Sequence, residues 1–140
     1  MSTRGQKFTV QWRQPIYYAD FMMDFSKNPD TGALATVTNE DSIGQSIRNL
    51  VETSFGERPG RNGIGSKVAS SLFNPSTPFT LDVLRASVLS VIENHEPRAD
   101  SVTVDAADQL LENAVTVTVT YRPVNLPQTV TLTFDLKRIR

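Results

Sequence analysis

Apolar residues recur at helical spacing in the first half of the chain. The first such stretch begins near Asn39, where Thr38 to Asp41 offer a cap with acids in the first turn, and it ends at Gly56. Its apolar positions fall on one face of a helix: Ile43, Ile47, Leu50, Val51 and Phe55. The pattern therefore predicts a helix over 39–55.

Two further helices are predicted before residue 97. A short one is indicated by Ile64, Val68 and Leu72 and stops before Pro75. The longest begins at 78–80, and Pro97 ends it because proline disfavours a helical conformation in the preceding residue. Its apolar stripe consists of Leu81, Leu84, Val88 and Ile92.

After residue 100 the hydrophobic period changes from helix to strand. Val102 and Val104 alternate with polar neighbours, and two better-patterned stretches, 115–122 and 129–136, alternate valine, leucine or aromatic residues with threonines. These two are expected to form an antiparallel pair with one buried face. The fold class is therefore α+β, with three helices packed on a small antiparallel C-terminal sheet.

This organisation suggests one domain over 33–140, with a short strand at 33–38 and a C-terminal β-ribbon at 129–138. Residues 1–32 form an aromatic-rich arm without a clear period. We expect its aromatic residues, such as Trp12 and Tyr17, either to clamp a neighbouring subunit or to pack on the chain's own helices. A short helix around Met22 is a further alternative.

Composition narrows the function. The 140 residues carry a net charge of −1, which argues against non-specific nucleic-acid binding. Cysteine is absent, so disulfides and thiolate metal sites are excluded. No apolar run is long enough to cross a bilayer, and the N-terminus lacks the apolar core of a signal peptide. We therefore expect the protein to be made in a cytoplasm and assembled there.

The stretch FGERPGRNGIGSK, residues 55–67, resembles a phosphate-binding loop superficially. Gly60 and Gly65 have the required spacing, but Lys67 comes one position late. A true phosphate loop follows a strand and opens a helix, whereas this stretch follows a helix. We interpret it as a turn between two helices.

The sequence offers little for catalysis. His95 is the single histidine, at the end of the longest predicted helix, and no nucleophile elbow is present. A pair among the fifteen acids would suffice for glycosidase chemistry, but nothing in the sequence singles one out. We predict no catalytic, metal or cofactor-binding residue.

Two features favour interaction. In Glu96-Pro97-Arg98 a rigid proline follows a helix end, and the arginine fork suits bidentate pairing with a partner carboxylate, or else remains solvated. The strand at 129–138 has no internal proline or glycine. If it lies at a sheet edge, its free backbone groups could template a strand from another chain.

Taken together, the stretches YADF, NPDTGAL, TNEDSIGQSIRNLVETSFGERPGRNGIGSKVASSLF and ENHEPRA, followed by two valine-rich strands, resemble a known family. This is the baseplate wedge and sheath-initiator family of contractile-tailed phages, some of whose members are called lysozyme-like and which is related to a type VI secretion baseplate component. The likeness covers roughly residues 17–138.

The resemblance implies a structural, non-enzymatic virion protein of the tail baseplate, assembled in the host cytoplasm. Its partners would be other wedge proteins in a core bundle, the tail sheath protein and, as a further candidate, the tail tube. The wedge contact maps onto Glu96, Pro97 and Arg98. Glu57 and Arg58 would hold local or intersubunit contacts. The residues expected to pair with sheath strands are Thr129, Thr131, Thr133, Asp135 and Lys137. The alternatives are a peptidoglycan-cleaving tail enzyme and a type VI secretion subunit.

Overall fold

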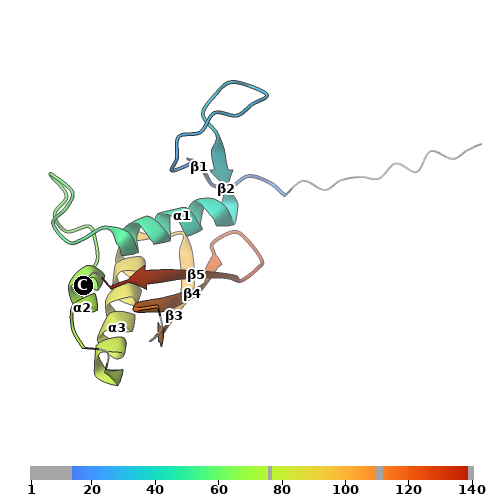
Figure 1. The fold of residues 1–140 in the computed structure, drawn as a ribbon. Coiled ribbons are helices and arrows are strands. Elements are labelled where there is room, and N and C mark those ends of the chain that lie inside the picture. Colours follow the sequence, from blue (N-terminus) through green and yellow to red (C-terminus); the bar gives the residue numbers. More distant parts are fainter. Residues whose placement is uncertain (1–13, 76, 110–111, 139–140) are drawn as a thin grey trace, which may run out of the picture.

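Two helices cover one face of a three-stranded antiparallel sheet (Figure 1). The computed structural model describes residues 14–75, 77–109 and 112–138. The sheet has the order β3 (Ala99–Gln109), β4 (Ala114–Pro123) and β5 (Val130–Lys137). The covering helices are α1 (Asn39–Glu52) and α3 (Pro78–His95), and α2 (Val68–Leu72) packs beside α3. The predicted α+β class with three helices is confirmed.

The core lies between the helices and the inward face of the sheet, as the alternation predicts. Its buried members from the helices are Ile43, Ile47, Val51, Val68, Leu84, Val88 and Ile92. Those from the strands are Ala106, Val115, Val117, Val119, Tyr121, Phe134 and Leu136. The threonines that alternate with these strand residues point to the opposite face, where Thr116 Oγ1 donates to Asp135 Oδ1 at 2.6 Å.

The sheet contains one strand more than the pair predicted from the clearest alternation. β3 spans 11 residues and pairs with β4, but its register shifts between Asp100 and Thr103. Ser101 has φ of 52° at this irregularity. Such a bulge interrupts the period-two pattern, which explains why only Val102 and Val104 stood out in the sequence.

The first helix is shorter than predicted. It ends at Glu52, because Thr53 turns extended and its hydroxyl donates to the carbonyl of Asn49 at 2.6 Å. Phe55 therefore lies beyond the helix and is 58% exposed, so its predicted place on the core face is wrong. Ile64 likewise precedes α2, which begins only at Val68.

The third helix agrees with its predicted start and stop. Thr77 caps it by accepting a hydrogen bond from Thr80 N at 3.2 Å, and Pro78 occupies the first turn, where its missing N–H costs nothing. The helix ends at His95, directly before Glu96 and Pro97. No helix within the described ranges is long and apolar enough to cross a membrane.

The described part of the N-terminal arm pairs with the strand predicted at 33–38, and together they form a small hairpin that projects from the body beside α1 (Figure 1). Its strands are β1 (Ala19–Phe21) and β2 (Thr36–Thr38), which pair antiparallel. The helix considered around Met22 does not form. Trp12, for which a clamp was expected, lies outside the described residues.

Candidate interaction surfaces

Glu96 and Arg98 form a bidentate ion pair at the end of α3. Arg98 Nε donates to Glu96 Oε1 at 2.6 Å, and Arg98 Nη2 donates to Glu96 Oε2 at 2.8 Å. The Glu96 side chain is 2% exposed, whereas that of Arg98 is 28% exposed. The pair therefore places a buried carboxylate against a guanidinium that still reaches the surface.

The electrostatics of the pair follow from this geometry. Burial acts to raise the pKa of Glu96, but hydrogen bonds from Arg98 and Ser46 and the positive charge of Arg98 outweigh burial and hold that pKa below its ordinary value. The hydrogen bonds to Glu96 raise the pKa of Arg98 despite its own burial. Both side chains therefore remain charged at neutral pH.

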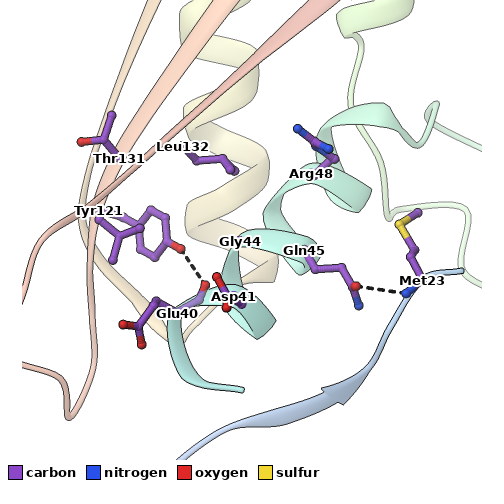
Figure 2. Close-up of a pocket in the computed structure, with 10 residues that line it drawn as sticks. Met23, Glu40, Asp41, Gly44, Gln45, Arg48, Tyr121, Thr131 and Leu132 are labelled. Carbon is purple, nitrogen blue, oxygen red and sulfur yellow. Dashed lines mark hydrogen bonds between the residues drawn. The ribbon is translucent and has the colours of Figure 1, made fainter. Parts of the chain in front are cut away.

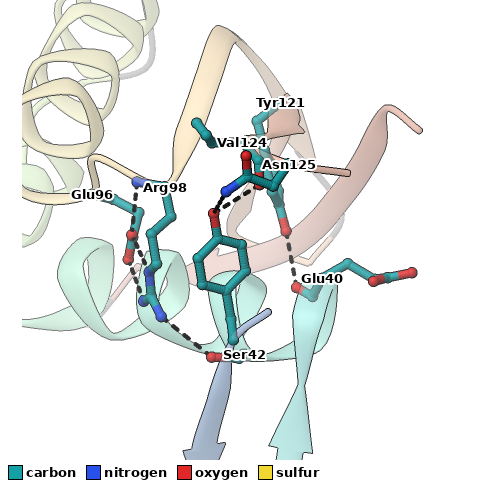
Figure 3. A network of polar contacts seen from close by, with 8 residues as sticks. Glu40, Ser42, Glu96, Arg98, Tyr121, Val124 and Asn125 are labelled. Carbon is teal, nitrogen blue, oxygen red and sulfur yellow. Dashed lines mark hydrogen bonds and ion pairs between the residues drawn. The ribbon is translucent and has the colours of Figure 1, made fainter. Parts of the chain in front are cut away.

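Arg98 also connects segments that are distant in sequence. Its guanidinium lies over the ring of Tyr18, 5.7 Å from the ring centroid, and Nη1 is 3.4 Å from Ser42 Oγ in α1. Its backbone carbonyl accepts from Val124 N at 2.8 Å, just after β4. Figure 3 shows Arg98 between Glu96 and Ser42, with the Val124 turn nearby.

Tyr18 ties the arm to the same cluster. Its hydroxyl donates to the carbonyl of Val124 at 2.7 Å, and its backbone carbonyl accepts from Asn39 N at 2.8 Å. The Asn39 side chain accepts from Tyr17 N at 2.9 Å and donates to the carbonyl of Pro15 at 3.1 Å. The cap position of α1 is Thr38, which makes no side-chain cap hydrogen bond, and the carboxamide of Asn39 binds the arm instead.

These contacts refine the expectation for the Glu-Pro-Arg triplet. The fork of Arg98 was expected to pair with a partner's carboxylate or to stay solvated, but it is occupied by Glu96 of its own chain. Pro97 is exposed beside the pair. Any partner at this site would meet a rigid, preassembled surface rather than a free guanidinium.

The C-terminal strand is an edge strand. β5 pairs with β4 in an unbroken register from Tyr121↔Val130 to Ala114↔Lys137, and β4 is its one neighbour in the described sheet. Four of the residues predicted to bind the sheath are exposed and point away from the core: Thr131, Thr133, Asp135 and Lys137. Thr129 is exposed too and directly precedes the strand.

The opposite edge, β3, is built differently. It carries the bulge at Ser101, and two acidic side chains on it form ion pairs across the surface. Arg122 Nη2 lies 2.8 Å from Asp100 Oδ2, and Arg85 Nη2 lies 2.9 Å from Asp105 Oδ1. Bulges and charges are devices that discourage strand addition, so the two edges are not equivalent.

A groove of about 390 Å³ runs between α1 and β5 (Figure 2). Its lining residues are Met23, Glu40, Asp41, Gly44, Gln45, Arg48, Tyr121, Val130, Thr131 and Leu132. Tyr121 donates from its hydroxyl to the carbonyl of Glu40 at 3.1 Å, and burial raises the pKa of Tyr121 to about 12. Because Thr131 is among the lining residues, the groove reaches the exposed side of β5.

Glu57 and Arg58 lie on the exposed loop between α1 and α2. Glu57 Oε2 accepts from Ser54 N at 2.9 Å, which is the local contact considered for it, and Arg58 is exposed. The loop closes where Ser54 bridges Ser66. A Cβ on Gly65 would stand 2.7 Å from the carbonyl oxygen of Ser54, so glycine is required there for backbone approach rather than for a phosphate.

The described residues hold no group of three or more histidines or acids that is placed to bind a metal. The pKa values of Asp24, Glu96 and Asp100 are all lowered, in Asp24 by hydrogen bonds from Ser26 and in Asp100 by a hydrogen bond from Arg122. A glycosidase general acid needs a raised pKa. These three carboxyls therefore do not fit that role.

Sequence reasoning identified the triplet and the edge strand but missed their surroundings. Tyr18 and Ser42 lie 80 and 56 residues before Arg98, and no periodic pattern links them to it. Nothing in the sequence pattern singles out Gly44, which lines the groove. Its packing partner Tyr121 is known only from the folded chain.

Comparisons with known proteins agree with this architecture. Baseplate protein W of Escherichia phage P2 is 31% identical over 101 residues, covering 72% of this chain and 87% of that protein. Baseplate wedge protein gp25 of Enterobacteria phage T4 is 33% identical over 64 residues, which span 46% of this chain and 48% of the T4 protein.

Solved structures share the fold. A candidate tail lysozyme of Geobacter sulfurreducens superposes with a TM-score of 0.70 at 23% identity, covering 77% of this chain and 98% of that one. A chain of the anti-feeding prophage baseplate gives 0.67 at 24% identity, covering 78% and 87%. A chain of the type VI secretion baseplate complex gives 0.55 at 15% identity, covering 69% and 92%.

A comparison with protein families gives the same result. Residues 37–127, more than half of the chain, match the family described as baseplate wedge protein gp25. The match begins at β2 and ends before β5, so it spans the three helices, β3, β4 and the Glu96–Arg98 pair. The chain belongs to the gp25 family of baseplate wedge proteins.

Proposed function

We propose that this protein is a structural subunit of a contractile phage tail baseplate that initiates the sheath by strand pairing along β5. Membership of the wedge family supports a place in the baseplate, and the free edge of β5 supports strand pairing as the way in which the sheath is initiated. An edge strand presents unpaired backbone donors and acceptors, to which an extended segment of another chain adds as a further strand. The proposed donor of that strand is the tail sheath protein.

The contrast between the two edges supports β5 as the acceptor. β5 has a continuous register over eight residues without a bulge, and its exposed residues are Thr131 and Thr133 followed by Asp135 and Lys137. β3 contains a bulge, and two of its aspartates form ion pairs with arginines. An added strand needs a regular row of backbone groups, which β5 offers over its whole length.

The proposed pairing gains strength from repetition. Each added strand contributes several backbone hydrogen bonds that individually stabilise by only about 1 kcal/mol. When several subunits meet a sheath ring together, each later contact forms at a high effective concentration. A baseplate ring therefore needs only modest affinity at each β5 edge.

The wedge contact is proposed to lie on the helical body. The surface around Glu96, Pro97 and Arg98 would dock other wedge proteins, with Glu57 and Arg58 as a further intersubunit contact. Exposed apolar side chains on the same body support protein docking: Phe73 is 69% exposed and Phe79 is 77% exposed. We propose other wedge proteins, the sheath and the tail tube as partners, and no nucleic acid.

We propose a non-enzymatic role for this chain. The likeness to a candidate tail lysozyme shows a common fold, and folds host unrelated functions. The three carboxyls with lowered pKa values, one of them held by Arg98, favour a structural role. A phage tail rather than a type VI apparatus is favoured because both relatives matched in sequence are phage proteins.

A lysine at Thr133 tests the edge. Thr133 is exposed on β5, and a charged side chain on an edge strand opposes the approach of another strand. We expect Thr133→Lys to weaken binding of the tail sheath protein of the same particle at least tenfold in a pull-down or titration. The melting temperature should change little, because the side chain points away from the core.

Thr103→Lys is the matched control, since Thr103 is exposed on the opposite edge strand. It should bind the sheath protein as the unchanged chain does. Equal binding by the Thr133→Lys variant, or a loss confined to Thr103→Lys, would contradict β5 as the acceptor edge.

A further inference from the structure

We propose that the groove between α1 and β5 selects the strand that pairs with β5, by taking one apolar side chain with a basic residue two positions away on one side and an acidic residue two positions away on the other. This inference rests on the proposed function, since it concerns the same added strand. It assigns recognition to side chains of α1, whereas the strand pairing itself uses only backbone groups.

The groove lies where such a side chain would arrive. Along β5, Val130 and Leu132 point toward the helices and Thr131 points away, yet all three line the groove. A strand added beside β5 continues this alternation, so every second side chain projects toward α1. Figure 2 shows Leu132 and Gly44 facing this space.

Gly44 forms the floor of the groove. A Cβ built at this residue would lie 3.5 Å from Tyr121 Oη and 3.9 Å from Leu132 Cδ1, which are ordinary contact distances. The absence of a side chain on Gly44 therefore leaves room beside Leu132. The surrounding apolar surface comes from Val130 and Leu132, so the space suits an aliphatic side chain.

The hairpin closes the groove on its outer side. Gln45 in α1 accepts from Met23 N at 3.1 Å and donates to the carbonyl of Phe21 at 2.8 Å, which fixes the end of β1 against the helix. Met23 consequently lines the groove opposite Leu132. The family match begins at residue 37, so this wall lies outside the matched region.

Charges at the two ends define the neighbours of the apolar side chain. Asp41 lies at the start of α1, beside the end of the groove where Gln128 contacts Glu40 at 2.6 Å. Arg48 lies at the other end, 5.9 Å from the ring centroid of Phe134. An added strand with a basic residue facing Asp41 and an acidic residue facing Arg48 is therefore complementary.

The test compares variants of the full-length chain for binding to the tail sheath protein of the same particle. Gly44→Leu fills the groove from its floor without touching the backbone edge of β5. Asp41→Lys reverses the charge at one end on an exposed helical position. We expect each substitution to weaken binding about tenfold, with the fold verified by circular dichroism and melting temperature.

Glu93 on α3 supplies the matched controls, because it is exposed and does not line the groove. Glu93→Leu and Glu93→Lys should bind as the unchanged chain does. Hydrogen exchange of the unchanged chain, with and without the sheath protein, reports on strand pairing separately. If the sheath protein protects the β5 amides from exchange but Gly44→Leu and Asp41→Lys bind normally, strand pairing stands and the selective groove is overturned. If the unchanged chain gives no β5 protection at all, the proposed function fails, and this inference fails with it.

Discussion

At the scale of single residues, Arg98 connects three segments that the sequence keeps far apart. It neutralises the buried carboxylate of Glu96, covers the ring of Tyr18 and approaches Ser42. A buried carboxylate without a partner is strongly disfavoured, so the pair constrains where the end of α3 and the arm are placed. The triplet is therefore part of the fold as well as a surface that a partner can contact.

Removing the guanidinium should destabilise the isolated domain. Arg98→Ala leaves Glu96 buried without its counter-charge, and we expect a loss of about 3 kcal/mol in the free energy of unfolding, measured with urea at pH 7. A second substitution, Glu96→Gln, in the Arg98→Ala background should recover part of that loss because the amide carries no charge. Unfolding of Arg98→Ala at the same urea midpoint as the unchanged chain would contradict a structural role for the pair.

The same pair predicts a pH dependence. The pKa of Glu96 is lowered in the folded state, so the unfolded chain binds the proton more tightly. The contribution of Glu96 to stability is therefore complete above the ordinary value of 4.5, and it is lost as pH falls through the lowered folded value. We expect the urea concentration at the unfolding midpoint to decrease as the pH is lowered from 5 to 3.

Other carboxyls titrate in this range, so the informative comparison is with Glu96→Gln. That variant should lose less stability between pH 5 and pH 3 than the unchanged chain, because it has no proton to gain at residue 96. Identical losses in the two proteins would show that the Glu96–Arg98 pair contributes nothing in acid.

Sequence reasoning at this scale located the triplet but not its partner. The spacing of Glu96 and Arg98 identifies two charges beyond a helix end, and either one could face outward. Whether the Arg98 guanidinium pairs with Glu96 of its own chain depends on how far the Glu96 side chain is buried. That burial is determined by the packing of α1 against α3. That packing is not encoded in the triplet itself.

At the scale of elements, β4 and β5 were predictable because their alternation is nearly perfect. Valines of β4 and Phe134 and Leu136 of β5 face the core, while threonines face outward. Their edge and centre positions were not predictable, since these depend on where β3 pairs. β3 joins β4 rather than β5, and this order leaves β5 with a free side.

The predicted C-terminal end of α1 was less accurate than its predicted core face. Phe55 continued the apolar spacing of α1, but the hydroxyl of Thr53 bonds the carbonyl of Asn49 and the chain turns away at that point. Asn39 had the character of a cap, but its side chain binds the arm. In both cases a local polar group found a competing partner, which periodicity does not report.

At the scale of the whole molecule, the proposed wedge surface extends from the Glu96–Arg98 pair, which contacts Ser42 in α1, to the exposed side chain of Phe79. The free β5 edge and its groove lie beside α1, near the hairpin, whereas Phe79 marks the start of α3 at the far end of the body (Figure 1). A subunit held in a wedge by the Phe79 end of its body still offers an open strand edge at β5. This arrangement suits a protein that connects a baseplate to a sheath.

The most direct test of strand pairing at β5 is hydrogen exchange of the full-length chain, measured by mass spectrometry with and without the tail sheath protein of the same particle. If β5 accepts a sheath strand, backbone amides within 130–137 become protected from exchange on binding, while those of β3 at 99–109 do not. Binding that leaves the β5 amides exchanging at their free rate would contradict strand pairing at this edge.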